Sequence, residues 1–117
     1  KDPDFEPINN YPLTVNDPTA TATIAKAFKE HFGDDAFECP PVGASEDFGR
    51  FGIAFESPYV YWFVGGTDQA KYDEAVKNNT VAALPSPHSP FWAPALHPTL
   101  RTGIETMLVA AGAWLAK

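Results

Sequence analysis

The sequence is poor in cysteine and in basic residues, and it has no long apolar run. Cys39 is the only cysteine among 117 residues, so no intrachain disulfide can form and a secreted, disulfide-stabilised fold is excluded. No apolar stretch approaches the ~20 residues that a membrane-spanning helix needs. Eight Lys and Arg stand against fifteen Asp and Glu, and this net charge of -7 disfavours nucleic acid and anionic membranes as partners. We therefore expect a cytoplasmic protein.

The apolar content is nevertheless high enough for a packed core. Hydrophobic residues make up 44% of the chain and aromatic residues 14%, which argues against disorder and favours one domain. The chain opens on Lys1 and its single methionine is Met107. We expect it to be a piece excised from a longer protein.

A helix is predicted over residues 18–32. Asn16 or Asp17 can cap its first turn, and Pro18 suits the first helical position, where a missing N–H is of no consequence. Apolar residues recur at helical spacing up to Gly33, which is typical of a helix end.

The rest of the chain predicts an α/β fold. A short helix is expected after Ser45, and the β-branched and aromatic run 58–64 is typical of a strand buried on both faces. The charged segment 67–80 is predicted to be a mobile surface loop. Thr99 is expected to cap a last helix that carries one apolar stripe. One strand cannot form a sheet, so its neighbours must be weak here or lie outside the chain.

His88 lies in the proline-rich segment 85–94, where each proline restricts its own φ and the residue before it. A stiff loop presents an imidazole at a fixed angle, as a metal ligand or a general acid or base requires. A histidine packed in a turn is the alternative. No paired-cysteine, H-x-x-x-H or H-E-x-x-H spacing occurs, so the chain does not predict a self-contained zinc site.

A second candidate site is the segment Gly43-Ala44-Ser45-Glu46-Asp47-Phe48. It can be read as a capped helix start, or as a polar cradle whose backbone N–H groups meet a carboxylate. Ser45 lacks the strand–G-x-S-x-G–helix context of a hydrolase nucleophile. Cys39 has no cationic neighbour in sequence that would activate its thiol, which indicates a small core or surface residue.

Three segments of the sequence form a recognisable set. They are Tyr11-Pro12-Leu13-Thr14-Val15-Asn16-Asp17-Pro18, then Gly43-Ala44-Ser45-Glu46-Asp47-Phe48, then Pro87-His88-Ser89-Pro90-Phe91. Together they resemble the metal-dependent amidohydrolases of the hippurate hydrolase and indole-acetyl-amino-acid hydrolase type, within the aminoacylase and carboxypeptidase superfamily. Their order and spacing agree with that family, and the resemblance spans nearly the whole chain. It covers only the carboxyl-terminal part of such an enzyme.

The resemblance implies a role for each matching residue. His88 would ligate a site of two divalent ions, zinc or manganese in the first place and cobalt or nickel as alternatives. Ser45, Glu46, Asp47 and Ser89 would line the substrate pocket or support the ligands. The family's other ligands and its water-activating glutamate have no match here, so no catalytic residue is expected within this chain.

The resemblance also implies domain organisation and function. Residues 1–13 would end a lid domain or form a linker, and 14–117 would form the carboxyl-terminal part of an αβα zinc-peptidase-like catalytic domain. The parent enzyme would be a homodimer that hydrolyses the amide bond of N-acyl amino acids or small peptides. The 117-residue chain would need the remainder of the parent chain as its partner and would be inactive alone.

Two other functions remain open from the sequence. The chain can be a free-standing small α/β binding or scaffold domain, with His88 structural and 59–63 as an interaction strand. It can also be a serine hydrolase that uses Ser45 and His88. A start codon near Lys1 would favour the scaffold, whereas an upstream His-x-Cys-Gly-His-Asp run would favour the amidohydrolase.

Overall fold

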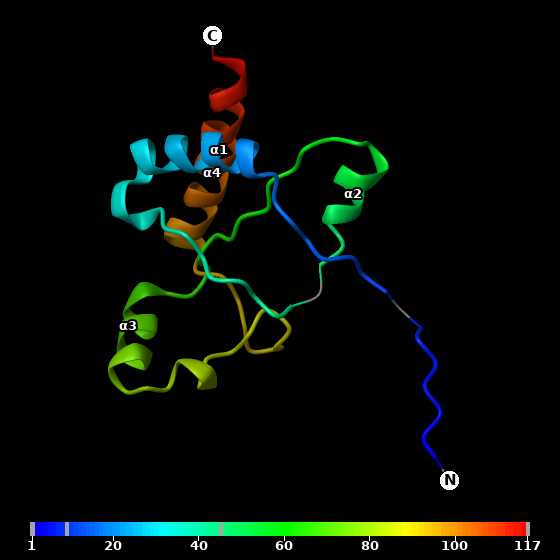
Figure 1. The fold of residues 1–117 in the computed structure, drawn as a ribbon. Coiled ribbons are helices and arrows are strands. Elements are labelled where there is room, and N and C mark those ends of the chain that lie inside the picture. Colours follow the sequence, from blue (N-terminus) through cyan, green and yellow to red (C-terminus); the bar gives the residue numbers. More distant parts are fainter. Residues whose placement is uncertain (1, 9, 45, 117) are drawn as a thin grey trace. The chain divides into compact units, whose positions relative to one another are not determined.

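The computed structural model describes residues 2–8, 10–44 and 46–116, and this part of the chain is helical. Figure 1 labels α-helices along the chain and draws no strand. Because no strand or sheet occurs in the described residues, the predicted α/β class is wrong. None of the described helices has the length and apolar character needed to cross a membrane. The elements in chain order are α1 (Pro18–Phe32), 3-10 helix η1 (Gly33–Asp35), α2 (Gly49–Ala54), α3 (Gln69–Lys77), 3-10 helix η2 (Val81–Ala83) and α4 (Leu96–Leu115).

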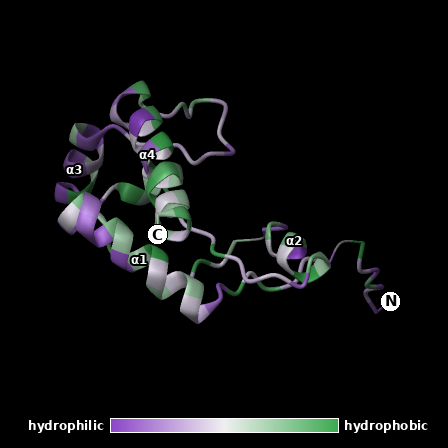
Figure 2. Ribbon diagram, turned by 90° about the horizontal axis from the view of Figure 1, so that it is seen from above, coloured by the Kyte–Doolittle hydropathy of each residue, from purple (hydrophilic) through white to green (hydrophobic). Residues whose placement is uncertain are grey.

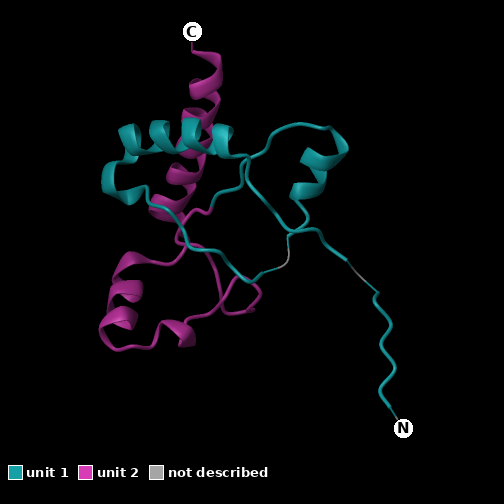
Figure 3. Cartoon of the chain, viewed as in Figure 1, with its two compact units in different colours: residues 1–62 teal, residues 63–117 magenta. Residues whose placement is uncertain are grey.

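The chain divides into two compact units, coloured separately in Figure 3. Unit 1 spans residues 1–62 and holds α1 and α2, and unit 2 spans residues 63–117 and holds α3 and α4. The expected end of a lid domain at residue 13 stays a prediction.

Helix α1 is the element that the sequence predicted best. The Asp17 carboxylate accepts a hydrogen bond of 2.7 Å from the N–H of Ala20, Pro18 takes the first helical position, and Gly33 ends the helix at a φ of 60°. A positive φ at this position costs a glycine little, which explains the sharp end. The N-cap is therefore Asp17, whereas the side chain of Asn16 bonds to Tyr61.

The segment predicted as a buried strand is extended, but the described part of the chain holds no strand beside it. The side chain of Asn16 occupies the hydrogen-bonding groups that a ladder would use: its Nδ2 donates to the carbonyl of Tyr61 at 2.8 Å, and its Oδ1 accepts from the N–H of Tyr61 at 2.7 Å. The carbonyl of Tyr59 accepts from the N–H of Asp17 at 2.9 Å. The predicted strand is wrong, and the backbone groups of Tyr59 and Tyr61 that a second strand would pair are bonded to Asn16 and Asp17, which are distant in sequence.

Helix α2 begins at Gly49, later than predicted, with Phe48 in the N-cap position and no side-chain cap. Ser45, the predicted cap, lies outside the described residues. The glycines of α2 face the ring of Tyr59: a Cβ on Gly49 would lie 2.9 Å from the Tyr59 Oη, and one on Gly52 would lie 2.0 Å from its Cδ1. Glycine therefore lets this short helix approach the ring closely.

Helix α3 corrects the prediction of a mobile loop over 67–80. Asp68 caps the helix by accepting from the N–H of Lys71 at 3.1 Å, and Gln69 donates to the Asp73 carboxylate at 2.8 Å across one turn. The charge of the Lys and Glu residues suggested a loop, but both residue types have favourable helix propensity. Ala75 is buried and gives α3 its packed side.

Helix α4 begins before the predicted cap, Thr99. Its N-cap position is Ala95, the residue His97 has non-helical φ and ψ, and Thr99 lies inside the helix. The Thr99 hydroxyl donates to the carbonyl of Gly65 at 3.3 Å, and the N–H of Ala95 donates to the carbonyl of Gly66 at 2.8 Å. These two bonds attach the start of α4 to the residues that follow Val64.

The core of the described residues is small. The buried apolar side chains are Ala20 and Ile24 in α1, Ala75 in α3 and Ala110 in α4, and no described side chain falls below 2% exposure. The chain exposes 10050 Å². Many large apolar side chains of the described residues are exposed, among them Phe5, Phe37, Phe55 and Phe91.

Candidate functional site

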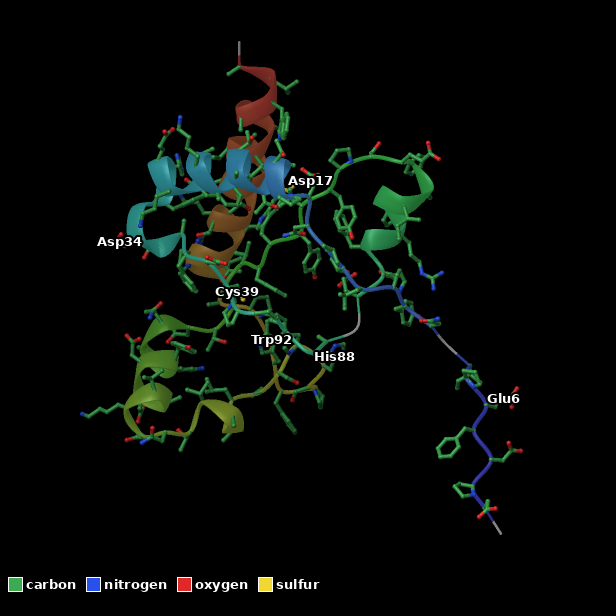
Figure 4. All side chains as sticks on the ribbon, viewed as in Figure 1. Glu6, Asp17, Asp34, Cys39, His88 and Trp92 are labelled. Carbon is green, nitrogen blue, oxygen red and sulfur yellow. The ribbon has the colours of Figure 1, made fainter. Side chains whose placement is uncertain are left out.

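His88 lies in a turn of unit 2 and its side chain is exposed (Figure 4). Two backbone bonds fold the loop around it: the N–H of Ser89 donates to the carbonyl of Ser86 at 2.8 Å, and the N–H of Trp92 donates to the carbonyl of Ser89 at 3.1 Å. Consecutive turns between prolines restrict the backbone on both sides of the imidazole. The ring of His88 is exposed on this turn, and both the stiffness of the loop and the metal-binding role of His88 stay predictions.

Ser89 supports the same turn. Its hydroxyl oxygen accepts a hydrogen bond of 3.2 Å from the N–H of Phe91, a local side-chain bond that stabilises loops. Ser89 is half-buried, while the Phe91 ring is 86% exposed. The predicted supporting role of Ser89 beside His88 therefore has a structural basis in the loop itself, independent of any metal.

Of the predicted acidic site residues in unit 1, Glu46 has the side chain that accepts the most hydrogen bonds. Its Oε1 accepts from the N–H of Asp47 at 2.9 Å and from the N–H of Phe48 at 3.0 Å, and its Oε2 accepts from the Tyr61 hydroxyl at 3.0 Å. The bond from Phe48, followed by the bond from Tyr61, holds the pKa of Glu46 below 4.5. The same carboxylate raises the pKa of Tyr61 above 10.0.

The backbone N–H groups at this turn are therefore directed at Glu46. The sequence predicted a cradle whose N–H groups meet a substrate carboxylate, but two of these donors already meet the carboxylate of Glu46. Asp47 is exposed, and Ser45 lies outside the described residues. In this structure the turn binds its own side chain, and a ligand would have to compete with it.

Tyr61 is a site residue that the sequence did not predict. Besides the bond to Glu46, its ring packs 5.4 Å from that of Phe48, which also lies 5.9 Å from the ring of Tyr59. These contacts join the acidic turn to the extended segment of unit 1. No local pattern shows them, because fifteen residues separate Glu46 and Tyr61 in sequence.

The predicted site residues fall into two groups in different units. Glu46 and Asp47 belong to unit 1, and His88 and Ser89 belong to unit 2. Within the described ranges, no three His, Cys, Asp or Glu side chains come together in a way that could hold a metal ion. The metal-ligand role of His88 therefore stays a prediction.

Cys39 has no part in this arrangement. It is exposed, and its thiol donates to the carbonyl of the adjacent Pro40 at 3.4 Å. Of the two interpretations, a core residue or a surface residue, its exposure agrees with the second. Searches for related proteins give no family by which to extend this picture: no family model matches the chain and no solved structure matches it.

Proposed function

We propose that the chain is part of a metal-dependent amidohydrolase that cleaves the amide bond of N-acyl amino acids or small peptides. The proposal is supported first by the three sequence segments that resemble such enzymes. The observation that carries it is the exposed imidazole of His88 on a turn braced by Pro87 and Pro90, since an enzyme that used this ring as a ligand would need it presented in this way.

The uncovered surface of the chain supports the idea of a missing remainder. Large apolar side chains are exposed in both units, and an obligate interface typically buries such side chains. The exposed side chains with the highest values in unit 1 include Phe5, Ile8, Leu13, Phe37 and Phe55. Another part of the parent chain would cover this surface and supply the other ligands.

Within the enzyme each residue of this chain would have a limited task. His88 would donate one ring nitrogen to a divalent ion, and Ser89 would hold the turn that aims it. When bound, the ions would supply Lewis-acid activation of the amide carbonyl and of water. Glu46 would keep the acidic turn in place through Tyr61 and would not transfer protons itself, because its lowered pKa makes it a poor acid or base near neutrality.

The proposal is tested on the parent coding sequence and its product. We expect an upstream His-x-Cys-Gly-His-Asp run and a zinc- or manganese-dependent hydrolysis of hippurate. His88→Ala should lower kcat/KM by more than the roughly 10–100-fold that is typical of residues behind the ligands. His97→Ala is the matched control, because His97 is also an exposed histidine of unit 2.

Two results would contradict the proposal. One is an open reading frame that starts near Lys1 and lacks the upstream run. The other is hydrolysis of hippurate by the purified 117-residue chain itself, because the described residues hold no complete ligand set.

A further inference from the structure

The two glycines Gly65 and Gly66 attach the loop that carries His88 to the rest of unit 2. The carbonyl of Gly66 accepts from the N–H of Ala95 at 2.8 Å, and the carbonyl of Gly65 accepts from the hydroxyl of Thr99 at 3.3 Å. The loop joins the hydrophilic helix α3 to the more hydrophobic helix α4 (Figure 2). The carboxyl end of the loop and the start of α4 are therefore bonded to the same two residues.

The side chain of Trp92 lies against Gly66. A Cβ built on Gly66 would be 3.0 Å from Cζ2 and 3.6 Å from Cη2 of Trp92, and 3.5 Å from Cβ of Pro94. The φ of Gly66 is outside the left-handed region, so the close approach of the ring is what favours glycine at this position. Trp92 is half-buried, whereas the adjacent Phe91 is 86% exposed, so Trp92 is the aromatic side chain by which the loop packs on unit 2.

Two consecutive turns connect Trp92 with His88, and we call residues 86–92 the tandem turns. The N–H of Ser89 closes the first turn on the carbonyl of Ser86 at 2.8 Å, and the N–H of Trp92 closes the second on the carbonyl of Ser89 at 3.1 Å. Each turn begins with a serine followed by a proline, residues typical of these positions in a β-turn. Trp92 therefore ends a pair of bonded turns in which His88 is the third residue.

The His88 ring depends on the tandem turns for its direction. Within the described residues, no hydrogen bond, ion pair or ring contact holds the imidazole itself. The ring is exposed, so the backbone of the turns decides where it points. A shift of Trp92 would move the carbonyl of Ser89 through their hydrogen bond, and Ser89 is covalently joined to His88.

We propose that Gly66 is a positioning residue for His88. The space that this glycine leaves receives the ring of Trp92, and the seated ring fixes the tandem turns that present the imidazole. This role deepens the proposed function and rests on it in one respect only, the binding of an ion by His88. Residues that support metal ligands typically change metal affinity by about 10–100-fold when they are replaced.

Gly65→Ala and Gly66→Ala form a matched pair of variants. A Cβ on Gly65 would meet nothing within 4 Å, whereas one on Gly66 would press on the ring of Trp92. Both glycines have φ values outside the left-handed region, so the backbone accepts alanine at either position and the two variants differ chiefly in this contact. Because an indole ring is rigid and attached close to the backbone, a methyl group at position 66 should displace the loop.

The test is amide hydrogen exchange of the 117-residue chain, followed by NMR. We expect Gly66→Ala to speed the exchange of the Ser89 and Trp92 N–H groups at least ~10-fold, because their turns lose the contact that holds them. Gly65→Ala should leave both rates unchanged. The N–H of Ala110, a buried residue of α4, is the internal reference for unfolding of the whole unit, and its rate should change in neither variant.

A second substitution tests whether the indole ring is the cause. Trp92→Phe in the Gly66→Ala background should return the exchange of the Ser89 N–H toward the rate of the unchanged chain, because the smaller ring makes room for the methyl group. A general loss of stability would not be repaired in this way. The positioning role is refuted if the double variant exchanges as fast as Gly66→Ala alone, or if Gly66→Ala and Gly65→Ala exchange alike.

The consequence for function is measured separately, as the zinc affinity of the parent enzyme in competition with a chromophoric chelator. Gly66→Ala should raise the zinc dissociation constant roughly 10–100-fold, whereas Gly65→Ala should not change it. Unchanged zinc affinity beside faster exchange would overturn the positioning role. A parent that bound neither zinc nor manganese would instead contradict the proposed function, while the exchange rates would still decide whether Gly66 holds the turns.

Discussion

The carboxamide of Asn16 holds both backbone groups of Tyr61, accepting from its N–H at 2.7 Å and donating to its carbonyl at 2.8 Å. This pair of bonds connects the residue before the α1 cap to a segment forty-five positions later in the sequence. It imitates the pairing that a neighbouring strand would provide, and it is a main long-range connection of unit 1.

Replacement of Asn16 by alanine should destabilise unit 1 by about 1–3 kcal/mol, since it leaves two partly buried backbone groups without partners. Asn16→Asp should be similarly damaging, because the carboxylate still accepts from the N–H of Tyr61 but places a second oxygen against the Tyr61 carbonyl in place of the Nδ2 donor. Urea unfolding followed by far-UV circular dichroism measures both. Asn10→Ala is the control, because Asn10 is exposed and contributes its backbone carbonyl to Arg50. Equal effects of Asn16→Ala and Asn10→Ala would contradict the assigned role.

Gly52 allows α2 to lie against Tyr59. A Cβ at this position would be 2.0 Å from Cδ1 and 2.7 Å from Cε1 of that ring, whose hydroxyl is fixed by the N–H of Val15. Gly52→Ala should therefore cost about 1–3 kcal/mol through overpacking. Gly112→Ala, in open space on α4, should stabilise the chain by about 0.5–1 kcal/mol. Thermal unfolding distinguishes the two, and a stabilising Gly52→Ala would show that the ring moves aside freely.

The lowered pKa of Glu46 predicts a specific pH dependence. A carboxyl whose folded pKa is below its unfolded value contributes stability that is complete above the unfolded value, near 4.5, and is lost as the pH falls through the folded value. Glu46→Gln should remove this acid-dependent loss, and Tyr61→Phe should reduce it by deleting one of the bonds. Urea unfolding at pH 7 and at a series of values below 4.5 measures it. An unchanged pH profile in Glu46→Gln would exclude this carboxylate as its source.

Local signals in the sequence predicted α1 and its two ends, because the Asp17 cap and Gly33 act within one turn of the helix. The extended segment was misread for a physical reason. A run of β-branched and aromatic residues indicates that a backbone can be extended, but it does not show whether a second strand lies beside it. Here the side chain of Asn16 bonds to the backbone of Tyr61 in place of a second strand. The contact could not be predicted, because the two residues are far apart in the sequence.

The candidate site was likewise predictable from the sequence only in part. Prolines around His88 predicted a constrained loop, since a proline acts on its own residue and the one before it, and the exposure of the ring is known only from the structure. The fate of the N–H groups near Glu46 could not be predicted, because it depends on a rotamer of Glu46 and on the hydroxyl of Tyr61. The residue types of a motif can thus suggest ligand binding even though the backbone N–H donors of the motif are already hydrogen-bonded to one of its own side chains.

Asp68 shows how one cap can outweigh a charged composition. The segment that follows it contains Lys71, Asp73 and Glu74, which suggested a solvated loop, yet the carboxylate of Asp68 accepts from the N–H of Lys71 at 3.1 Å and begins α3. Asp68→Ala should therefore cost about 0.5–2 kcal/mol and reduce helicity measured by circular dichroism. Asp73→Ala removes an acid of the same charge whose partner, Gln69, is exposed, so it should cost less. If Asp73→Ala proved the more damaging of the two, α3 would be held by side-chain pairing along its surface, and the cap would not be its determinant.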